Sequence, residues 1–301
     1  HLFTGQGHAP APPLAQETGA VPQGLAALDC PDWLAPALQD ALGDDFAPVL
    51  TLLRQRAPVF LRVNLRRATR AEAQAALTAE GIATRPHPLA DTALEVLENP
   101  RRIRDSQAFL QGLVELQDAA SQALVAALPL RDGMRVLDYC AGGGGKALAM
   151  GARAGLRLDA HDADRRRMAD LPARAARAGL RVRQLATADL PARGPWDLVL
   201  ADAPCSGSGS WRRSPEGKWA LTPARLDQLC RTQAQVLDAA ARLVAPGGVL
   251  AYATCSLLQA ENDDRIAAFL ARSPGFAPLT RRVWTPLDGG DGFFLATLGR
   301  A

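Results

Sequence analysis

From residue 131 onward, short apolar segments alternate with longer segments of helical periodicity, and this alternation constrains the fold more than any other feature of the sequence. It predicts strands at 134–140, 156–162, 182–187, 197–204 and 249–256. It predicts helices at 146–154, 164–178, 223–244 and 260–271, and a final edge strand at 293–298. Such alternation is typical of a parallel sheet with helical crossovers. We therefore expect a Rossmann-like α/β domain over residues 131–301.

The first 130 residues have a different pattern. Residues 1–50 are rich in proline and glycine, which predicts a linker or an extended segment. Residues 51–130 predict a small α+β domain with strands at 58–64, 82–87 and 92–98 and a helix at 68–80. A connecting helix at 120–128, capped by Asp118, is expected to lead into the large domain.

Composition excludes several classes of protein. The chain of 301 residues is 48% hydrophobic and 22% charged, which is typical of a globular protein. No stretch approaches the roughly 18 apolar residues that a membrane helix needs, and the pattern of a secretory signal is missing. We therefore expect a cytoplasmic protein. The five cysteines lie singly and form no CxxC pair, which argues against a disulfide framework or a zinc site.

The net charge of +3 is unevenly distributed along the chain. It amounts to −6 over residues 1–53, +5 over 54–104, −3 over 105–130 and +7 over 131–301. Basic segments of this kind suit a polyanion such as nucleic acid. However, arginine outnumbers lysine by 32 to 2, and a compositional bias of this size scatters arginines over any surface. Charge alone therefore favours a nucleic-acid partner only weakly.

A glycine turn follows the first predicted strand of the large domain. Asp138 is followed by four glycines (142–145) and Lys146, so a ligand can approach the backbone closely at the start of a helix. The spacing matches neither the dinucleotide pattern GxGxxG nor GxxxxGK[ST]. Asp162 and Asp189 follow the next two strands, where a carboxylate can accept hydrogen bonds from ribose or adenine. Each acid alone is typical of a helix cap or a loop, but together they indicate an adenosyl cofactor.

Two cysteines follow the last two predicted parallel strands. Cys205 lies just after Asp202, and Cys255 lies 50 residues further on. Because these strands are expected to be neighbours, the two cysteines should converge at one end of the sheet. A lone cysteine at a strand end is usually a small buried hydrophobe. Two of them beside Asp202 and Lys146 predict instead a thiol of lowered pKa that acts as a nucleophile.

These features resemble the S-adenosylmethionine-dependent RNA cytosine-5 methyltransferases related to bacterial RsmB and the eukaryotic Sun proteins. The resemblance covers about residues 50–301 and rests on separate motifs, which are Arg62-Val63-Asn64, Gln117-Asp118-Ala-Ala-Ser121, Gly144-Gly145-Lys146, Asp202-Ala-Pro204-Cys205-Ser-Gly207, Arg212-Arg213-Ser-Pro215 with Lys218-Trp219, Thr254-Cys255-Ser256 with Glu261-Asn262, and Asp291-Gly292-Phe293-Phe294. Two positions depart from the family, which usually has Pro where this chain has Gly143 and Thr or Ser where it has Ala147.

The resemblance implies a class I methyltransferase sheet and assigns roles to the residues at its strand ends. Cys255 would be the nucleophile that adds to cytosine C6, and Cys205 would assist the later elimination. Asp202 would bind the N3/N4 edge of the base, and Lys146 would orient both the base and Asp202. S-adenosyl-L-methionine would bind to a larger set of residues, which comprises Asp138, Cys140, Ala141, Gly142, Gly143, Gly144, Gly145, Lys146, Asp162, Asp189 and Asp202.

The implied partner is RNA, with ribosomal RNA favoured over transfer RNA, and the target base must leave any helix to reach the cysteines. The candidate RNA-binding residues are Arg62, Arg66, Arg67, Arg212, Arg213 and Lys218. Trp211 either packs or stacks on a base, whereas Trp219 is expected to pack. The segment from Asp291 to Phe294 is expected to close the edge of the sheet, outside the active site.

Other functions remain open at this point. A catalytically silent RNA-binding or assembly factor with the same fold is compatible with the altered glycine turn, although both cysteines argue against it. A nicotinamide-dependent oxidoreductase has the wrong glycine spacing. DNA offers the same cytosine chemistry as RNA, but the Thr254-Cys255-Ser256 arrangement resembles the RNA group. No metal is expected, and a monomer is the expected oligomeric state.

Overall fold

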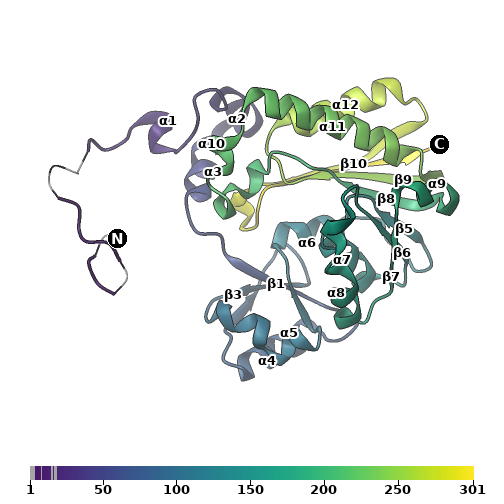
Figure 1. Ribbon diagram of the computed structural model, residues 1–301, viewed down its shortest axis with the longest axis horizontal. Coiled ribbons are helices and arrows are strands. Elements are labelled where there is room, and N and C mark those ends of the chain that lie inside the picture. The colour runs from purple at the N-terminus through teal and green to yellow at the C-terminus, as the bar shows by residue number, and fades with distance from the viewer. Residues whose placement is uncertain (1–3, 8, 15, 17–18) are drawn as a thin grey trace.

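The computed structural model describes residues 4–7, 9–14, 16 and 19–301, and it contains two β-sheets (Figure 1). A seven-stranded sheet has the order β10-β11-β9-β8-β5-β6-β7, and a four-stranded sheet has the order β2-β3-β1-β4. The expected fold class, a Rossmann-like sheet with a smaller N-terminal α+β domain, is confirmed.

The large sheet contains the five parallel strands that the sequence predicts. They are β5 (Arg135–Asp138), β6 (Arg157–His161), β7 (Val182–Leu185), β8 (Trp196–Asp202) and β9 (Val244–Thr254). β11 (Phe293–Arg300) pairs antiparallel with β9, and β10 (Phe276–Trp284) pairs antiparallel with β11. The expected edge position of the final strand is therefore wrong. β10 was not predicted because it is an exposed strand that contains Pro278 and two arginines rather than an apolar run.

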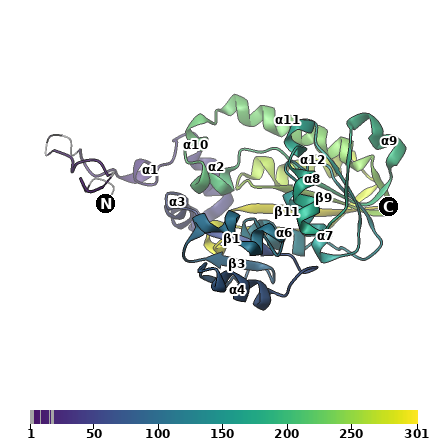
Figure 2. The ribbon, with the colours of Figure 1, turned by 60° about the horizontal axis from the view of Figure 1, so that its bottom comes forward.

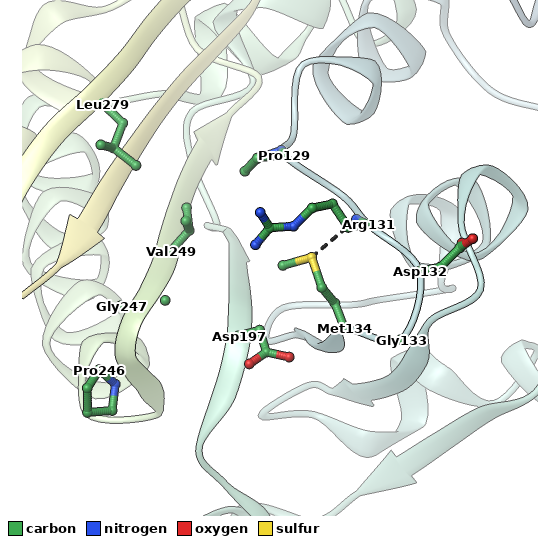
Figure 3. A pocket seen from close by; sticks show the side chains of 11 residues that line it. Pro129, Arg131, Asp132, Gly133, Met134, Asp197, Pro246, Gly247, Val249 and Leu279 are labelled. Carbon is green, nitrogen blue, oxygen red and sulfur yellow. Dashed lines mark hydrogen bonds between the residues drawn. The ribbon is translucent and has the colours of Figure 1, made fainter.

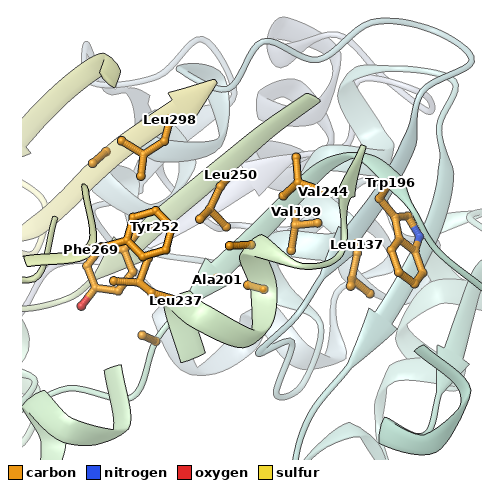
Figure 4. Packing of buried hydrophobic residues seen from close by; sticks show 14 of the residues in the cluster. Leu137, Trp196, Val199, Ala201, Leu237, Val244, Leu250, Tyr252, Phe269 and Leu298 are labelled. Carbon is orange, nitrogen blue, oxygen red and sulfur yellow. The ribbon is translucent and has the colours of Figure 1, made fainter. Parts of the chain in front are cut away.

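Helices cover both faces of this sheet (Figures 1 and 2). One face carries α6 (Ala119–Ala126), α7 (Gly145–Arg153) and α8 (Leu171–Ala178). The other face carries α9 (Leu190–Arg193), α11 (Pro223–Ala241) and α12 (Asp263–Arg272). Alternate strand residues point to opposite faces. Figure 4 shows one of the resulting cores, in which Leu137, Val199 and Leu250 of the strands pack with Leu237 of α11 and Phe269 of α12.

The smaller sheet is antiparallel throughout. β1 (Val59–Val63) lies between β3 (Ala93–Val96) and β4 (Val114–Leu116), and β2 (Thr84–Pro86) pairs with β3. α4 (Arg70–Ala79) begins with a capping box between Thr69 and Glu72, and the short α5 (Gln107–Leu110) precedes β4. The predicted strands and helix of this domain are confirmed, whereas the sequence did not predict β4.

The N-terminal segment contains more helix than expected. After the short α1 (Gly24–Ala27), α2 (Ala35–Leu42) and α3 (Phe46–Leu53) bury Leu38, Val49 and Leu50 against the loops of the large domain. Pro36 stands in the first turn of α2, where a missing N–H costs no hydrogen bond. The expected extended conformation is therefore wrong for residues 35–50. Residues 1–3, 8, 15 and 17–18 of that expectation lie outside the described residues.

Short 3-10 helices complete the elements, namely η2 (Gly43–Asp45), η3 (Pro100–Asp105), η4 (Arg165–Met168), η5 (Thr187–Asp189), η6 (Ser208–Arg213), η7 (Gln259–Glu261) and η8 (Pro286–Asp288), together with the α-helical turn α10 (Gly217–Ala220). Among the described residues, no helix is long and apolar enough to cross a membrane. The division into segments at residues 50 and 130 stays a prediction.

Candidate active site

The carboxyl ends of β8 and β9 bring the two predicted cysteines together. The Sγ atoms of Cys205 and Cys255 lie 3.3 Å apart. Lys146, in the first turn of α7, donates from Nζ to Oδ2 of Asp202 at 2.6 Å, and Asp202 is the last residue of β8. These four side chains, predicted from three separate motifs, thus form one group at the carboxyl ends of the parallel strands.

The two thiols differ in their electrostatics. The hydrogen bond from Cys205 is the main cause that lowers the pKa of Cys255, and Lys146 and Ser210 act in the same direction against burial and Asp202. The same hydrogen bond raises the pKa of Cys205 well above its ordinary value, and burial adds to this rise. Cys255 is therefore the thiol of the pair that ionises more readily.

Lys146 is held as a buried cation. Burial acts to lower its pKa, but the charge and the hydrogen bond of Asp202 outweigh this effect and raise the pKa. The Nζ atom also lies 4.9 Å from the centre of the Phe293 ring, within the range of a cation–π contact. The expectation that Phe293 lies outside the active site is therefore wrong. The sequence placed β11 at the sheet edge, so it gave no reason to bring Phe293 near α7.

The glycine turn before α7 has the backbone that only glycine adopts easily. Gly142 and Gly144 have φ angles of +49° and +78°, and a Cβ on Gly144 would lie 2.2 Å from Cδ1 of Leu171. The backbone N–H of Gly142 donates to Oδ2 of Asp162 at 2.9 Å. Asp162 is buried and also pairs with Arg167. The turn and the end of β6 therefore form one rigid unit.

Asp138, at the end of β5, has a buried carboxylate whose two oxygens make no hydrogen bond of normal geometry, although the nearby backbone N–H of Ala147 acts to lower its pKa. Burial, helped by the charge of Asp202, raises the pKa of Asp138 to about 7. A buried polar group without a partner is unfavourable, so these oxygens suit a ligand with cationic or N–H groups.

The remaining residues predicted to bind the cofactor follow β5 and β7. Burial raises the pKa of Cys140, which is therefore a thiol, and the backbone N–H of Ala141 donates to the carbonyl oxygen of His161. Asp189 is exposed at the rim, where its carboxylate accepts from the N–H of Ala186. These residues could hold an elongated cofactor that extends from the glycine turn across the ends of β6 and β7.

Gly143, which stands where the family usually has Pro, lies against the side chain of Arg174. The guanidinium of Arg174 donates to the carbonyl oxygen of Gly143, and a Cβ on Gly143 would lie 2.8 Å from Nη1 of Arg174. The absence of a side chain thus leaves room for Arg174, which also contacts Glu115. Ala147 is fully buried in the core under the sheet.

Two of the candidate RNA-binding arginines attach the small domain to the large one. Arg62 is buried and donates to Oε1 of Gln117 at 2.5 Å and to the carbonyl oxygen of Gly145 at 2.8 Å. Nearby, Asn64 donates to Ala178 at 2.9 Å and Arg66 donates to Gly151 at 2.8 Å. The burial of Arg62 contradicts a direct contact with RNA.

The candidates in the loop after β8 are paired with acids. The side chain of Arg212 is only 5% exposed and bonds Asp291, while Arg213 bonds both Asp291 and Asp118. Lys218 is buried beside Asp29. Direct RNA contact is therefore contradicted for Arg212 and Lys218, because their charges are buried and neutralised by acids far away in sequence. Of the six candidates, Arg66, Arg67 and Arg213 are exposed.

Trp211 and Trp219 differ in burial. Trp211 is buried among the apolar residues of α2 and α3, so it packs. Trp219 is 57% exposed and donates to Oδ1 of Asp29 at 3.1 Å. The packing expected of Trp219 is therefore wrong.

A cavity of about 680 Å³ lies near the amino ends of β5, β8 and β9, at the end of the sheet opposite the cysteines (Figure 3). It is lined by Arg131 and Met134 before β5, Asp197 at the start of β8, and Pro246 and Val249 of β9. Since Asp197 is near the start of β8 and Asp202 ends it, this cavity is not part of the cysteine site.

The strand order, the glycine turn and the acids at successive strand ends define a Rossmann-like methyltransferase fold. A family model described as 16S rRNA methyltransferase RsmB/F matches residues 125–299, and one described as the ferredoxin-like domain of RsmF/B-like methyltransferases matches residues 30–104. The chain belongs to the RsmB/F methyltransferase family. The family resemblance expected from the motifs is confirmed.

Curated relatives agree with this assignment. The chain is 34% identical over 284 residues to ribosomal RNA small subunit methyltransferase B of Vibrio cholerae, covering 90% of this chain and 65% of the relative. It is 35% identical over 285 residues to the protein of that name from Salmonella arizonae, covering 89% and 66%. The chain thus spans about two thirds of the length of these relatives.

A solved structure supports the fold. A methyltransferase homologue from Pyrococcus horikoshii superposes with a TM-score of 0.77 at 24% identity, over 92% of this chain and 97% of that one.

Proposed function

We propose that the protein transfers a methyl group from S-adenosyl-L-methionine to C5 of a cytosine in ribosomal RNA. The observation that carries this proposal is the contact of Cys205 and Cys255 beside the Lys146–Asp202 pair, at the end of the sheet that holds the glycine turn. The name of the curated relatives, ribosomal RNA small subunit methyltransferase B, supports ribosomal RNA as the substrate.

The cofactor would be held by the glycine turn and by the acids at the strand ends. The unpartnered carboxylate of Asp138 would accept hydrogen bonds from a cationic or N–H group, and Asp162 and Asp189 would lie toward the ribose and the adenine. When bound there, S-adenosyl-L-methionine supplies an electrophilic methyl group.

Cys255 makes the base reactive. Cytosine C5 is not nucleophilic enough to take a methyl group unaided, so the Cys255 thiolate first forms a bond to C6, which makes C5 electron-rich. Asp202 binds the N3/N4 edge of the base by accepting a hydrogen bond from the N4 amino group. The cation of Lys146, which lies 2.6 Å from the Asp202 carboxylate, offsets the negative charge that develops on the ring. The side chain of Asp202 is 28% exposed, so an extruded base can reach it from this edge.

Cys205 assists the release of the product. After methylation, a solvent water takes the proton from C5, the C–H electron pair forms the C5–C6 double bond, and the S–C6 bond breaks with its electron pair going to the sulfur of Cys255. The thiol of Cys205 lies 3.3 Å from that sulfur and donates to it, so it stabilises the departing thiolate. Without Cys205, addition and methylation remain available while elimination slows.

The proposal is tested by incubating the protein with S-adenosylmethionine and in-vitro transcribed small-subunit ribosomal RNA, followed by bisulfite sequencing. One or a few cytosines should become protected by the wild type and by Cys230→Ala, whose thiol lies on α11 outside the site. Cys255→Ala should protect none. Methyl incorporation at a base other than cytosine would reject the cytosine assignment. Tight RNA and cofactor binding without transfer would favour the catalytically silent factor.

A further inference from the structure

One buried carboxylate lies behind both cysteines. Glu261, the last residue of η7, is fully buried. Its Oε1 accepts from the backbone N–H of Ser206 at 2.8 Å, and its Oε2 accepts from the hydroxyl of Ser256 at 2.5 Å. The hydroxyl of Ser206 donates to Oε2 as well. Ser206 follows Cys205 and Ser256 follows Cys255, so the same side chain bonds the residue next to each cysteine.

The carboxylate is itself held in place. Gln233 of α11 donates from Nε2 to Oε1 of Glu261 at 2.9 Å and to the carbonyl oxygen of Pro204 at 3.0 Å. The hydroxyl of Tyr252 donates to the carbonyl oxygen of Glu261 at 2.7 Å. These donors anchor Glu261 to α11 and to β9, so it forms a fixed support for both loops.

We propose that Glu261 is a positioning residue that holds the Cys205 loop against the Cys255 loop and thereby keeps the two sulfur atoms in contact. The loops follow different strands, and the cysteines are 50 residues apart in sequence. The 3.3 Å contact depends on the relative placement of the loops, and Glu261 bonds directly to both. The catalytic meaning of this placement rests on the proposed function, whereas the placement itself does not.

The chemistry of the site requires a carboxylate rather than a neutral group. Four donors converge on its two oxygens, from Ser206 (backbone and hydroxyl), Ser256 and Gln233. A carboxylate only accepts, and its two oxygens can satisfy all four. An amide has a single oxygen and two N–H donors, so it would leave some of these groups unsatisfied. The charge of Glu261 also acts to raise the pKa of Cys205, in the same direction as its hydrogen bond with Cys255 and its burial.

The test measures the thiols directly, without RNA or cofactor. The folded protein is treated with iodoacetamide across pH 6–9, and mass spectrometry of the peptides compares the alkylation rates of Cys255 and Cys205. In the wild type, Cys255 should react much faster than Cys205. In Glu261→Ala this selectivity should fall about tenfold or more, because the loops separate and Cys255 loses its donor. Glu261→Gln should give an intermediate value.

Asp159→Asn is the matched control for loss of a buried carboxylate. Asp159 is buried and bonds Arg183 and Trp196, so its loss should lower the melting temperature without altering thiol selectivity. Wild-type selectivity in Glu261→Ala, at a temperature where the variant is folded, would overturn the proposal. If Glu261→Ala does not fold, Glu261→Gln decides in the same way.

A second measurement links the placement to the reaction. In the transfer assay with small-subunit ribosomal RNA, Glu261→Gln should lower kcat by roughly 10- to 100-fold and leave the KM for the cofactor unchanged. An unchanged kcat alongside lost thiol selectivity would overturn the catalytic part of the proposal. If the wild type shows selective thiols but no methyl transfer, the proposed function fails while the positioning role of Glu261 stands.

Discussion

Gly292 donates its backbone N–H to the carbonyl oxygen of Gly209 at 2.8 Å, and a Cβ built on Gly209 would lie only 2.2 Å from the oxygen of Gly292. Gly209 in turn donates to the carbonyl oxygen of Cys255 at 2.9 Å. These backbone hydrogen bonds join η6 to the residue just before β11 and to Cys255. A side chain at position 209 therefore has no space.

Gly209→Ala should push these backbones apart. We expect a loss of about 1–3 kcal/mol in the free energy of unfolding, as for other overpacked sites. Because Gly209 bonds Cys255 directly, the alkylation rate of Cys255 should also change. Gly275→Ala is the control, since a Cβ there would meet no atom within 4 Å. Urea unfolding and thiol alkylation of both variants check this prediction, and equal stability of the two would contradict it.

The two cysteines should give different covalent products on RNA. Cys205→Ala should allow addition and methylation but slow elimination, so protein bound to RNA should accumulate as a slow-migrating band on a denaturing gel. Cys255→Ala should form no such band, because no nucleophile remains. Trapping by Cys255→Ala alone would exchange the two roles. A double variant with full activity would exclude covalent catalysis.

The pH dependence of Cys255 should change when its donor is removed. In the wild type, the hydrogen bond from Cys205 is the main cause of the lowered pKa of Cys255, so the thiolate persists to lower pH than for an ordinary thiol. In Cys205→Ala, burial and Asp202 act with less opposition, so the pKa of Cys255 should rise. The midpoint of Cys255 alkylation should then move to higher pH. An unchanged midpoint would assign the lowering to Lys146.

The fold was predictable where its signals are local. The apolar runs of β5, β6, β7, β8 and β9 predicted the parallel sheet and brought Cys205 and Cys255 to one end of it. β10 was missed because an exposed edge strand lacks an apolar run. α2 was missed because the prolines of the N-terminal segment predicted an extended chain, whereas the helix packs on a distant loop. Local pattern says little about elements whose stability comes from long-range contacts.

Dependence on long-range contacts also limits prediction of the site. The motif positions placed Lys146 and Asp202 near the cysteines, as the structure has them. Contact between Phe293 and Lys146 depends on β11 lying beside β9, and the burial of Arg212 depends on Asp291, 79 residues away. An arginine that pairs with a distant acid has the same sequence pattern as one that binds phosphate.

Asp138→Asn should stabilise the protein and weaken cofactor binding. In the folded protein the pKa of Asp138 is about 7, raised from 3.8 by burial and by Asp202. Between these values the folded state holds a proton that the unfolded state has lost, so stability falls as pH rises and is lowest above pH 7. The variant should therefore gain about 2–4 kcal/mol over the wild type at pH 8 and less at pH 5.

Urea unfolding at the two pH values and calorimetry with S-adenosylmethionine check this prediction. A stability difference that does not grow with pH would mean that Asp138 does not titrate in this range. Unchanged affinity for the cofactor would remove Asp138 from the binding site.

Neighbouring arginines in the small domain should separate domain docking from RNA binding. Arg66 and Arg67 are both exposed, but only Arg66 donates to the large domain, at the carbonyl oxygens of Gly151 and Ala154. Arg66→Ala should cost about 1 kcal/mol of stability through the lost hydrogen bonds and leave the salt dependence of RNA binding unchanged. Arg67→Ala should keep stability but weaken RNA binding and reduce its salt slope by about one, as loss of a phosphate contact does. Filter binding of a single-stranded ribosomal RNA fragment at several salt concentrations measures the slope, and an unchanged slope for Arg67→Ala would assign that arginine to the solvated surface.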